Sequence, residues 1–432
     1  MSDYLYTLES HLDGNQAKAV AAVQRITTEA GMNAWLAGGA MRDMLRGAPI
    51  RDLDFVVERD ALKIARAVAE ALGGKVLSED EWKRGAELEL PGHVMASVGN
   101  SRTERYSKLG AKPHIGHATI HEDLSRRDFT INAIALALNR GSRGLLIDPT
   151  NGQADLVNRE LRTTSGMAFF DDPARIFRLI RFRHTLGFEV VPRTQSQFEN
   201  ALQENYQKSA SPAVLAHEIR AAFSDVSVVG MLEAFDANNL LKILSPALTG
   251  AKLNALGLTK LEKLMHSTVA PGTPGGALAF LHVLTEKLNA TERASVIRAF
   301  ALSHAESAEF KKLEAQAKKL ESALKSARIH KPSDVWGVLH NVSPDEILMV
   351  LYQSGVRVVH DRIRAYYEKY LPTSQEVTEE QVIASGAKPG TPKFDKTFNA
   401  MIVTRLNARP RKVVEPEPTT PAMAAAAARG RK

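Results

Sequence analysis

The fold is decided by one stretch of the chain, Trp35-Leu-Ala-Gly-Gly-Ala-Met-Arg-Asp-Met-Leu-Arg-Gly-Ala-Pro-Ile-Arg-Asp-Leu-Asp-Phe-Val-Val57. A short apolar run ends at Gly38-Gly39, and a helical segment follows. Because glycine carries no side chain, backbone N–H groups at this turn can approach a phosphate, and the following helix N-terminus favours an anion. Arg42, one turn into the helix, adds a mobile positive charge. The stretch predicts a strand, a phosphate-binding turn and a helix.

Two aspartates follow that helix. Gly47 and Pro49 end it, and Asp52-Leu-Asp54 opens a run of strand-forming residues that reaches Val57. Alternation along a strand puts both carboxylates on one face, about 7 Å apart, where they suit a hard cation such as Mg²⁺. An isolated Asp-x-Asp is more typical of a solvated strand end. The preceding glycines and arginine favour a metal site here.

These motifs together resemble a known family. Gly38-Gly39-x-x-Arg42-Asp43 followed by Asp52-x-Asp54 is similar to the signature of the class II tRNA nucleotidyltransferase and poly(A) polymerase family, within the DNA polymerase β-like nucleotidyltransferases. The resemblance covers residues 15 to 225 well and the remainder loosely. It implies an α+β fold, in which a head with a mixed sheet is followed by a mostly helical neck, body and tail.

The composition fits such a protein without requiring it. A chain of 432 residues allows two to four domains, and its net charge of +7 favours an anionic partner. No run approaches 18 apolar residues, so nucleic acid is favoured over a membrane, although a basic protein without a polyanion partner stays open. The absence of cysteine excludes disulfides, thiolate catalysis and cysteine-ligated zinc. The N-terminus lacks the features of a signal peptide, which predicts the cytoplasm.

The order of motifs and breaks predicts five segments. They are a catalytic head (1–150), a helical neck with the base-selecting helix (151–230), a helical RNA-binding body (231–370), a tail (371–407) and a disordered basic C-terminus (408–432). Within the head, a helix over 15–31 and strands near 76–77, 87–90 and 94–98 predict a small mixed sheet flanked by helices.

One position departs from the family pattern. Family members have a third carboxylate on the strand before Arg102-Thr-Glu-x-Tyr106, and Ser97 stands in its place. A hydroxyl is a poorer Mg²⁺ ligand than a carboxylate, so Glu104, Glu89 or substrate phosphates would complete the shell. Residues 101 to 120 are rich in small and polar residues, which predicts a mobile loop.

The family's second motif matches residues 122 to 135. Arg127 can bind a triphosphate, and Asp128 can accept a hydrogen bond from a ribose hydroxyl, which would favour ribonucleotides. The alternative is that Arg126, Arg127 and Asp128 form only a charge cluster at a helix start, with the aspartate balancing the helix dipole.

A second informative stretch runs from Asp171 to Phe182. At helical spacing, Arg175, Arg178 and Arg181 share one stripe, with apolar residues on the opposite arc. Asp172 can accept from the exocyclic amine of cytosine or adenine while Arg175 donates to the adjacent ring nitrogen, and guanine and uracil present the opposite groups. Similar proteins use these positions as an amino-acid template, usually with glutamate where Asp171 stands. The alternative is a helix capped by Asp172 that exposes a solvated basic face.

Later motifs are weaker. The family's fifth motif, which braces the neck, aligns with Ser211–Ile219, but Ala213 and Val214 replace its Glu-Arg pair. Lys311–Arg328 is either an RNA-backbone face or a solvated helix. Gly386–Pro392 resembles the Gly-x-Lys-Pro-Gly segment near the end of many tRNA nucleotidyltransferases.

The resemblance and the residues lead to one hypothesis: template-independent addition of CMP and AMP (CCA) to the 3′ end of tRNA, from CTP and ATP, with release of pyrophosphate. A poly(A) polymerase, a specialised A-adding or CC-adding enzyme, and a non-catalytic RNA-binding protein are the alternatives. The expected cofactor is Mg²⁺, held by Asp52 and Asp54, which are also the catalytic residues. The expected nucleotide-binding residues are Gly38, Gly39, Arg42, Arg127, Asp128, Asp172, Arg175, Arg178 and Arg181.

Overall fold

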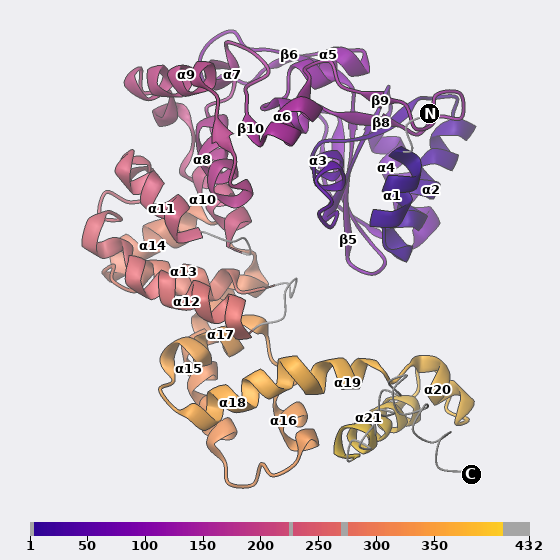
Figure 1. The fold of residues 1–432 in the computed structure, drawn as a ribbon, viewed down its shortest axis with the longest axis vertical. Helices are drawn as coiled ribbons and strands as arrows, with labels where there is room; N and C mark the ends of the chain where they lie inside the picture. Colours follow the sequence, from indigo (N-terminus) through magenta and orange to yellow (C-terminus); the bar gives the residue numbers. More distant parts are fainter. Residues whose placement is uncertain (1–3, 224–227, 269–274, 409–432) are drawn as a thin grey trace, which may run out of the picture. The chain divides into compact units, whose positions relative to one another are not determined.

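The computed structural model describes residues 4–223, 228–268 and 275–408 (Figure 1). The chain forms two compact units, of which the first comprises Met1–Glu262 with Gly275–Lys311 and the second comprises Lys263–Pro274 with Lys312–Lys432. The predicted C-terminal segment 408–432 lies, apart from residue 408, outside the described residues. The division into head, neck, body and tail stays a prediction.

A mixed sheet organises the first unit, as the sequence predicts. Its strand order is β3-β4-β5-β2-β1-β8-β9, and β2 runs parallel to β5 while the other pairs are antiparallel. The strands are β1 (Ala34–Ala37), β2 (Asp52–Val57), β3 (Lys75–Asp80), β4 (Gly85–Leu90), β5 (Val94–Asn100), β8 (Ala135–Ala137) and β9 (Leu146–Ile147).

Helices cover this sheet and extend beyond it. α4 packs on β4 and β5 through its apolar face, which includes the buried Ile64 and Val68. The helices up to residue 237 are α1 (Tyr4–His11), α2 (Gly14–Glu29), α3 (Gly39–Leu45), α4 (Ala61–Leu72), α5 (Ile120–Ser125), α6 (Gly152–Asn158), α7 (Ala168–Asp171), α8 (Ala174–Leu186), α9 (Pro192–Gln203), α10 (Pro212–Ala222) and α11 (Val228–Ala237).

The turn between β1 and α3 is built as the sequence predicts. Gly38 has φ +68°, a conformation that L side chains rarely adopt, and it is the residue that precedes α3. Gly47, with φ +67°, follows the helix end. The glycine turn therefore lies at the C-terminal end of β1, and α3 leads back to β2 beside it.

One local prediction is wrong in part. The mobile loop predicted over residues 101–120 contains secondary structure, because β6 (Arg102–Arg105) pairs with β7 (His114–His117) in an antiparallel hairpin; the mobility of the segment stays a prediction. The hairpin is also tied to the β3–β4 turn, since Trp82 Nε1 donates to the Pro113 carbonyl at 3.1 Å. The composition of the segment did not reveal this pairing, because the two strands are short.

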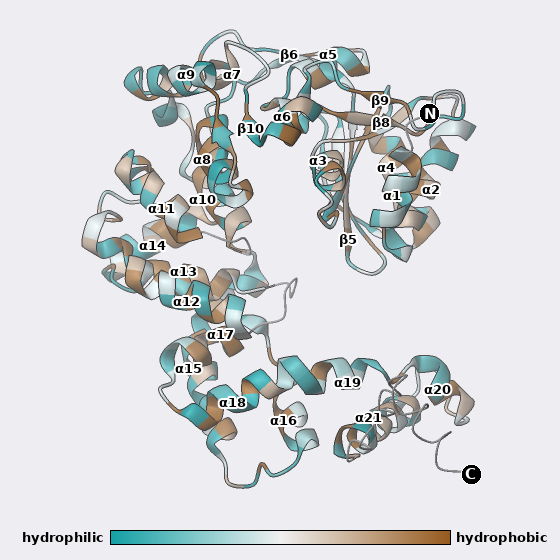
Figure 2. Ribbon diagram, viewed as in Figure 1, coloured by the Kyte–Doolittle hydropathy of each residue, from teal (hydrophilic) through white to brown (hydrophobic). Residues whose placement is uncertain are grey.

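α8 is the helix that carries the arginine stripe, and it shows both hydrophilic and hydrophobic colours in Figure 2. Its apolar side, which includes Ile176, Phe177 and Leu179, is buried, and α8 packs against α10 and α11. Phe177 meets Phe235 of α11 edge to face, with ring centroids 6.3 Å apart. Burying each such side chain contributes about 1.5–3 kcal/mol, so the apolar side anchors the stripe.

The remainder is helical, which confirms the predicted class. The helices are α12 (Ala255–Thr268), α13 (Ala277–Thr285), α14 (Ala290–Ala299), α15 (His304–Lys325), α16 (Pro332–Leu339), α17 (Pro344–Gln353), α18 (Arg357–Ala365), α19 (Leu371–Gln375), α20 (Glu379–Ala384) and α21 (Pro392–Asn407). Val382, Ala387 and Phe394 form a small core between α20 and α21. Within the described ranges, none of the helices combines the length and apolar content needed to cross a bilayer.

Candidate active site

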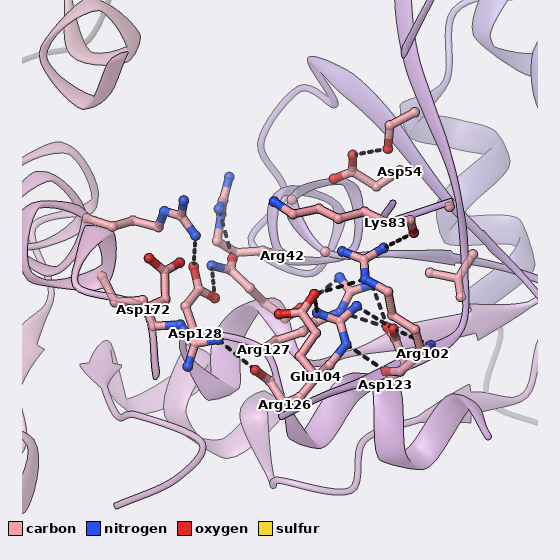
Figure 3. Close-up of a pocket in the computed structure, with 18 of the residues that line it drawn as sticks. Arg42, Asp54, Lys83, Arg102, Glu104, Asp123, Arg126, Arg127, Asp128 and Asp172 are labelled. Carbon is pink, nitrogen blue, oxygen red and sulfur yellow. Dashed lines mark hydrogen bonds and ion pairs between the residues drawn. The ribbon is translucent and has the colours of Figure 1, made fainter. Parts of the chain in front are cut away.

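A cavity of about 620 Å³ is lined by residues at the ends of the central strands β1 and β2 and by residues of α8 (Figure 3). Its volume is in the range of small-molecule sites. Every predicted site residue except Asp52 lines it, namely Gly38, Gly39, Arg42, Asp54, Arg127, Asp128, Asp172, Arg175, Arg178 and Arg181. Residues that are separated by more than a hundred positions in the sequence therefore share one cavity.

The two aspartates stand at the start of β2. Asp54 pairs in register with Ser97 of β5, and the Ser97 hydroxyl donates to Asp54 Oδ1 at 2.9 Å. The pKa of the Asp52 carboxyl is raised, first by loss of hydration and next by the negative charge of Asp54. A divalent cation beside Asp52 would favour its charged form again. The pair fits Mg²⁺, which binds through one or two carboxylates together with substrate phosphates.

The side chains expected to replace a third carboxylate are engaged elsewhere. Glu104 accepts from Arg102 Nε at 2.9 Å, from Arg126 Nη1 at 3.0 Å and from the Tyr106 hydroxyl at 2.7 Å. Burial opposes the charged form of Glu104, but the neighbouring arginines, Arg126 foremost, lower its pKa overall. Glu89 contacts the His93 ring at 3.0 Å. The prediction that Glu104 or Glu89 completes the shell is therefore not supported by these contacts.

At Gly38 two charged side chains lie close to the backbone. A Cβ at this position would lie 3.0 Å from Arg127 Nη1 and 3.0 Å from Asp54 Oδ2. A Cβ at Gly39 would lie 3.6 Å from Arg42 Nη2 and 3.7 Å from Asp54 Oδ2. The glycine turn, two guanidinium groups and one carboxylate thus surround the same small space, which suits a metal-bound phosphate.

Arg42 is held more firmly than the sequence predicts. It is buried, and its guanidinium donates to Asp43 at 2.9 and 3.0 Å and to Asn132 Oδ1 at 3.0 Å. Its Cζ also lies 5.3 Å from the centroid of the Phe182 ring. The prediction of a mobile charge is wrong, because long-range packing gives this cation a fixed position.

Arg127 and its neighbours lie between α5 and a short 3₁₀ helix, η1 (Thr130–Asn132), and do not begin an α-helix. α5 starts with Thr119 as its N-cap and ends before Arg126, so a charge cluster at a helix start is wrong. Arg126 and Arg127 both pair with the buried Asp123, at 2.5 and 3.2 Å. Burial opposes the charge of Asp123, but these arginines, Arg127 foremost, lower its pKa. Asp123 therefore orients two cations toward the cavity.

Asp128 joins the second motif to α8. It accepts from the Phe129 backbone N–H at 2.7 Å, from Asn132 Nδ2 at 3.1 Å and from Arg178 Nη1 at 2.9 Å. Burial alone would raise its pKa, but the charge and hydrogen bond of Arg178 outweigh burial and lower the pKa of Asp128 to about 2. Asp128 is an ionised acceptor at the cavity wall.

Asp172 and Arg175 lie at the start of α8. Asp172 Oδ1 accepts from the Ala174 N–H at 3.0 Å, so it does cap the helix start in part. Arg175 is buried and donates to the Arg126 carbonyl at 2.7 Å, while its Nε is buried without a hydrogen-bond partner among the described residues. The alternative of a solvated basic face is wrong for Arg175. A buried, unpaired donor is costly, so the side chain of Arg175 carries an unmet hydrogen-bonding group in a residue that lines the cavity.

The remaining arginines share an acceptor that sequence reasoning missed. Glu218 of α10 is 1% exposed and accepts from Arg178 Nε at 3.1 Å and from Arg181 Nε at 2.6 Å. It stands at the eighth position of the altered fifth motif, where the family pattern also has glutamate. The glutamate that remains in that motif was the signal that could have revealed it.

Comparisons with known proteins concern the family and the fold of the chain. Residues 34–162 match the family model described as the poly A polymerase head domain. An A-adding tRNA nucleotidyltransferase of Halalkalibacterium halodurans is 34% identical over 276 residues, which are 61% of this chain and 61% of that protein. A multifunctional CCA protein of Aliivibrio salmonicida is 36% identical over 188 residues, covering 42% of this chain and 43% of that protein. The chain thus spans less than two thirds of these relatives.

A solved structure resembles nearly the whole chain. The Thermotoga maritima CCA-adding enzyme complexed with tRNA_CCA has a TM-score of 0.53 and 25% identity, and the match covers 94% of this chain and 95% of that one. The family resemblance seen in the motifs is confirmed. Residues 34–162 of this chain belong to the poly A polymerase head domain family.

Proposed function

We propose that this protein adds CMP and AMP to the 3′ end of tRNA, using CTP and ATP and releasing pyrophosphate. One observation carries the proposal: a single cavity holds the glycine turn, an Asp-x-Asp carboxylate and the Asp172–Arg175 pair. These groups supply a phosphate site, a metal site and a base-reading site. A non-catalytic RNA-binding protein would need none of them in one place.

The phosphate end of the cavity would receive the triphosphate. The Gly38 turn exposes backbone N–H groups without a side chain, and Arg42 and Arg127 are held beside it. Asp52 and Asp54 would hold Mg²⁺, which when bound neutralises charge on the triphosphate and activates the RNA hydroxyl. Ser97 donates to Asp54 Oδ1 and thereby orients that carboxylate.

The opposite end would read the sugar and the base. Asp128, ionised and held by Arg178, can accept from a ribose hydroxyl. Asp172 accepts from the exocyclic amine of cytosine or adenine, and Arg175 donates to the adjacent ring nitrogen. Uracil and guanine would place a carbonyl against the carboxylate and an N–H against the guanidinium. A template strand is therefore unnecessary for choosing C or A.

A specialised A-adding enzyme is the second candidate. Proteins named A-adding tRNA nucleotidyltransferase from Halalkalibacterium halodurans and Aquifex aeolicus are each 34% identical to parts of this chain, and the Aquifex match covers 28% of that protein. The Asp172–Arg175 pair suits either base, so it does not separate the two candidates. The predicted cytoplasmic location stays a prediction in both cases.

The decisive experiment uses purified protein and three tRNA transcripts: one that lacks the 3′ CCA, one that ends in CC, and one complete. Each is incubated with CTP, with ATP and with both, and the products are sequenced. The proposed function predicts two cytidines with CTP, little product with ATP alone on the shortest transcript, and termination after CCA with both. An Asp54→Asn variant is the control for contaminating activity.

The other outcomes assign the alternatives. Addition of one adenosine to the CC transcript, with no use of CTP on any transcript, would identify an A-adding enzyme. Cytidine addition that stops at CC would identify a CC-adding enzyme. Long adenosine tracts on tRNA or generic RNA with ATP alone would identify a poly(A) polymerase. Binding of the transcripts without incorporation of any nucleotide would leave only an RNA-binding protein.

A further inference from the structure

Lys83 reaches the cavity from an element that none of the family motifs includes. It lies in the turn between β3 and β4, and its side chain lines the cavity. In Figure 3 the Lys83 side chain points into the cavity and directs its ammonium group toward Arg42. It therefore approaches the phosphate end of the cavity rather than the end that holds Asp172.

The backbone of this turn is fixed. The Lys83 N–H donates to Asp80 Oδ1 at 2.8 Å, and the Lys83 carbonyl accepts from Arg102 Nη1 at 3.2 Å. The adjacent Trp82 donates to the Pro113 carbonyl, and Lys112 Nζ lies 3.9 Å from the centroid of its indole ring. The turn and the β6–β7 hairpin thus hold the base of the Lys83 side chain while its flexible stem stays free to adjust.

Lys83 differs from most arginines of the cavity in how its charge is used, and it differs from Arg175, which donates to the carbonyls of Ala168 and Arg126, in having no hydrogen bond at its charged group. Arg42, Arg102, Arg126, Arg127, Arg178 and Arg181 all form ion pairs with protein carboxylates. Among the residues that the structure describes, no hydrogen bond or ion pair is formed by the Lys83 ammonium group. Within the described ranges the ammonium group thus makes no direct contact with a carboxylate, so it can bind an anionic ligand at little cost in broken contacts.

We propose that Lys83 binds the triphosphate of the incoming nucleotide and stabilises the departing pyrophosphate. This inference rests on the proposed function. In the transfer, the RNA 3′ oxygen loses its proton to solvent and forms a bond to the α-phosphorus. The bond between the α-phosphorus and the bridging oxygen breaks, and that oxygen leaves with the electron pair as part of pyrophosphate. A compact cation on a four-carbon stem can follow that group as its negative charge grows.

Binding without RNA tests the contact separately from transfer. ATP and AMP affinities are measured by calorimetry, with Mg²⁺ present, for the wild-type protein and for Lys83→Ala, Lys83→Arg and Lys75→Ala. Lys75 is an exposed lysine at the start of β3 that does not line the cavity, which makes it the matched control. We expect Lys83→Ala to weaken ATP binding by about tenfold, as for loss of one charge-assisted hydrogen bond, and to leave AMP binding unchanged. Lys83→Arg should recover most of the loss.

Inorganic tripolyphosphate and the kinetics of transfer give independent readouts. Tripolyphosphate should compete with ATP less well in Lys83→Ala than in the wild type. In turnover assays the KM for the nucleotide should rise while the KM for RNA stays constant. A rise in the RNA KM alone would assign the contact to an RNA phosphate and overturn the proposal.

Two further results would also overturn it: equal losses of ATP and AMP affinity, or unchanged ATP affinity in a variant that keeps the wild-type unfolding temperature. If Lys83→Ala lowers that temperature, Lys83→Gln provides the same charge test with a longer polar side chain. Failure of the proposed function would look different. A wild-type protein that transfers no nucleotide but loses ATP affinity through Lys83→Ala would refute the reaction and keep the triphosphate site.

Discussion

Glu218→Gln tests the contact that most depends on tertiary structure. The Glu218 side chain is 2% exposed, and the side chains of its two partners, Arg178 and Arg181, are 30% and 14% exposed. Glutamine keeps the size of the side chain and one acceptor oxygen but removes the negative charge. Arg178 would retain Asp128 as a counterion, whereas Arg181 would have lost its carboxylate.

The expected cost follows from that geometry. Removing one partner of a buried ion pair costs about 3–5 kcal/mol, because a charge is left without compensation away from water. Arg178 keeps one carboxylate and Arg181 borders a wet cavity, so we expect about 3 kcal/mol, at the lower end of the range. Because both arginines line the cavity, the KM for the nucleotide should also rise, while the KM for RNA should not.

Denaturant unfolding followed by tryptophan fluorescence measures the stability change. Trp336 belongs to the second unit, so a Trp336→Phe background leaves only Trp35 and Trp82, which report on the first unit. Glu204→Gln, at an exposed position beyond the end of α9, is the matched control and should change the free energy of unfolding by less than about 0.5 kcal/mol.

A double variant decides whether the pair is responsible. If Arg181 is destabilised because its charge is buried and unpaired, Glu218→Gln with Arg181→Gln should be more stable than the sum of the single changes predicts, by about 1–3 kcal/mol. Strict additivity, or a Glu218→Gln variant as stable as wild type, would refute the reasoning that this carboxylate neutralises the arginine stripe.

Three further predictions concern the cavity. Asp54→Asn should lower nucleotide incorporation by at least about 100-fold at unchanged RNA affinity, because it removes an anion that would hold the metal. Asp60→Asn is the control, and near wild-type turnover of Asp54→Asn would refute the metal-binding role of Asp54. Asp172→Ala should lose rate and discrimination against UTP and GTP in a four-nucleotide mixture, since Arg175 donates without testing for an amine; incorporation confined to C and A at normal rate would make Asp172 only a helix cap. The folded-state pKa of Asp128 is lowered to about 2 from 3.8, so its ionised form stabilises the fold above pH 4 and that stabilisation is lost as the pH falls toward 2. Asp128→Asn should therefore cost about 2 kcal/mol at pH 7 and nothing near pH 2, as measured by unfolding at both values.

Local pattern accounts for much of the site. Short sequence periods determine backbone conformation and the direction in which side chains point. Three features of the site depend on these two properties: the adjacent glycines, the Asp-x-Asp at a strand start and the arginines at helical spacing. The mixed sheet, the glycine turn and the face that presents Arg175, Arg178 and Arg181 could therefore be predicted. The resemblance to a family then placed these elements in one architecture.

The partners of these side chains were decided by tertiary structure. Arg42 bonds Asn132, ninety positions away, and Glu218 bonds Arg178 and Arg181 across forty and thirty-seven. Lys83 lines the cavity because β4, which follows it, pairs with β5. The hydrophobic pattern of a single strand does not show which strand it pairs with. A sequence pattern specifies which face of an element a side chain occupies. Which charge it meets there depends on the packing of elements that are distant in the chain, and that packing turns a mobile or solvated arginine into a fixed one.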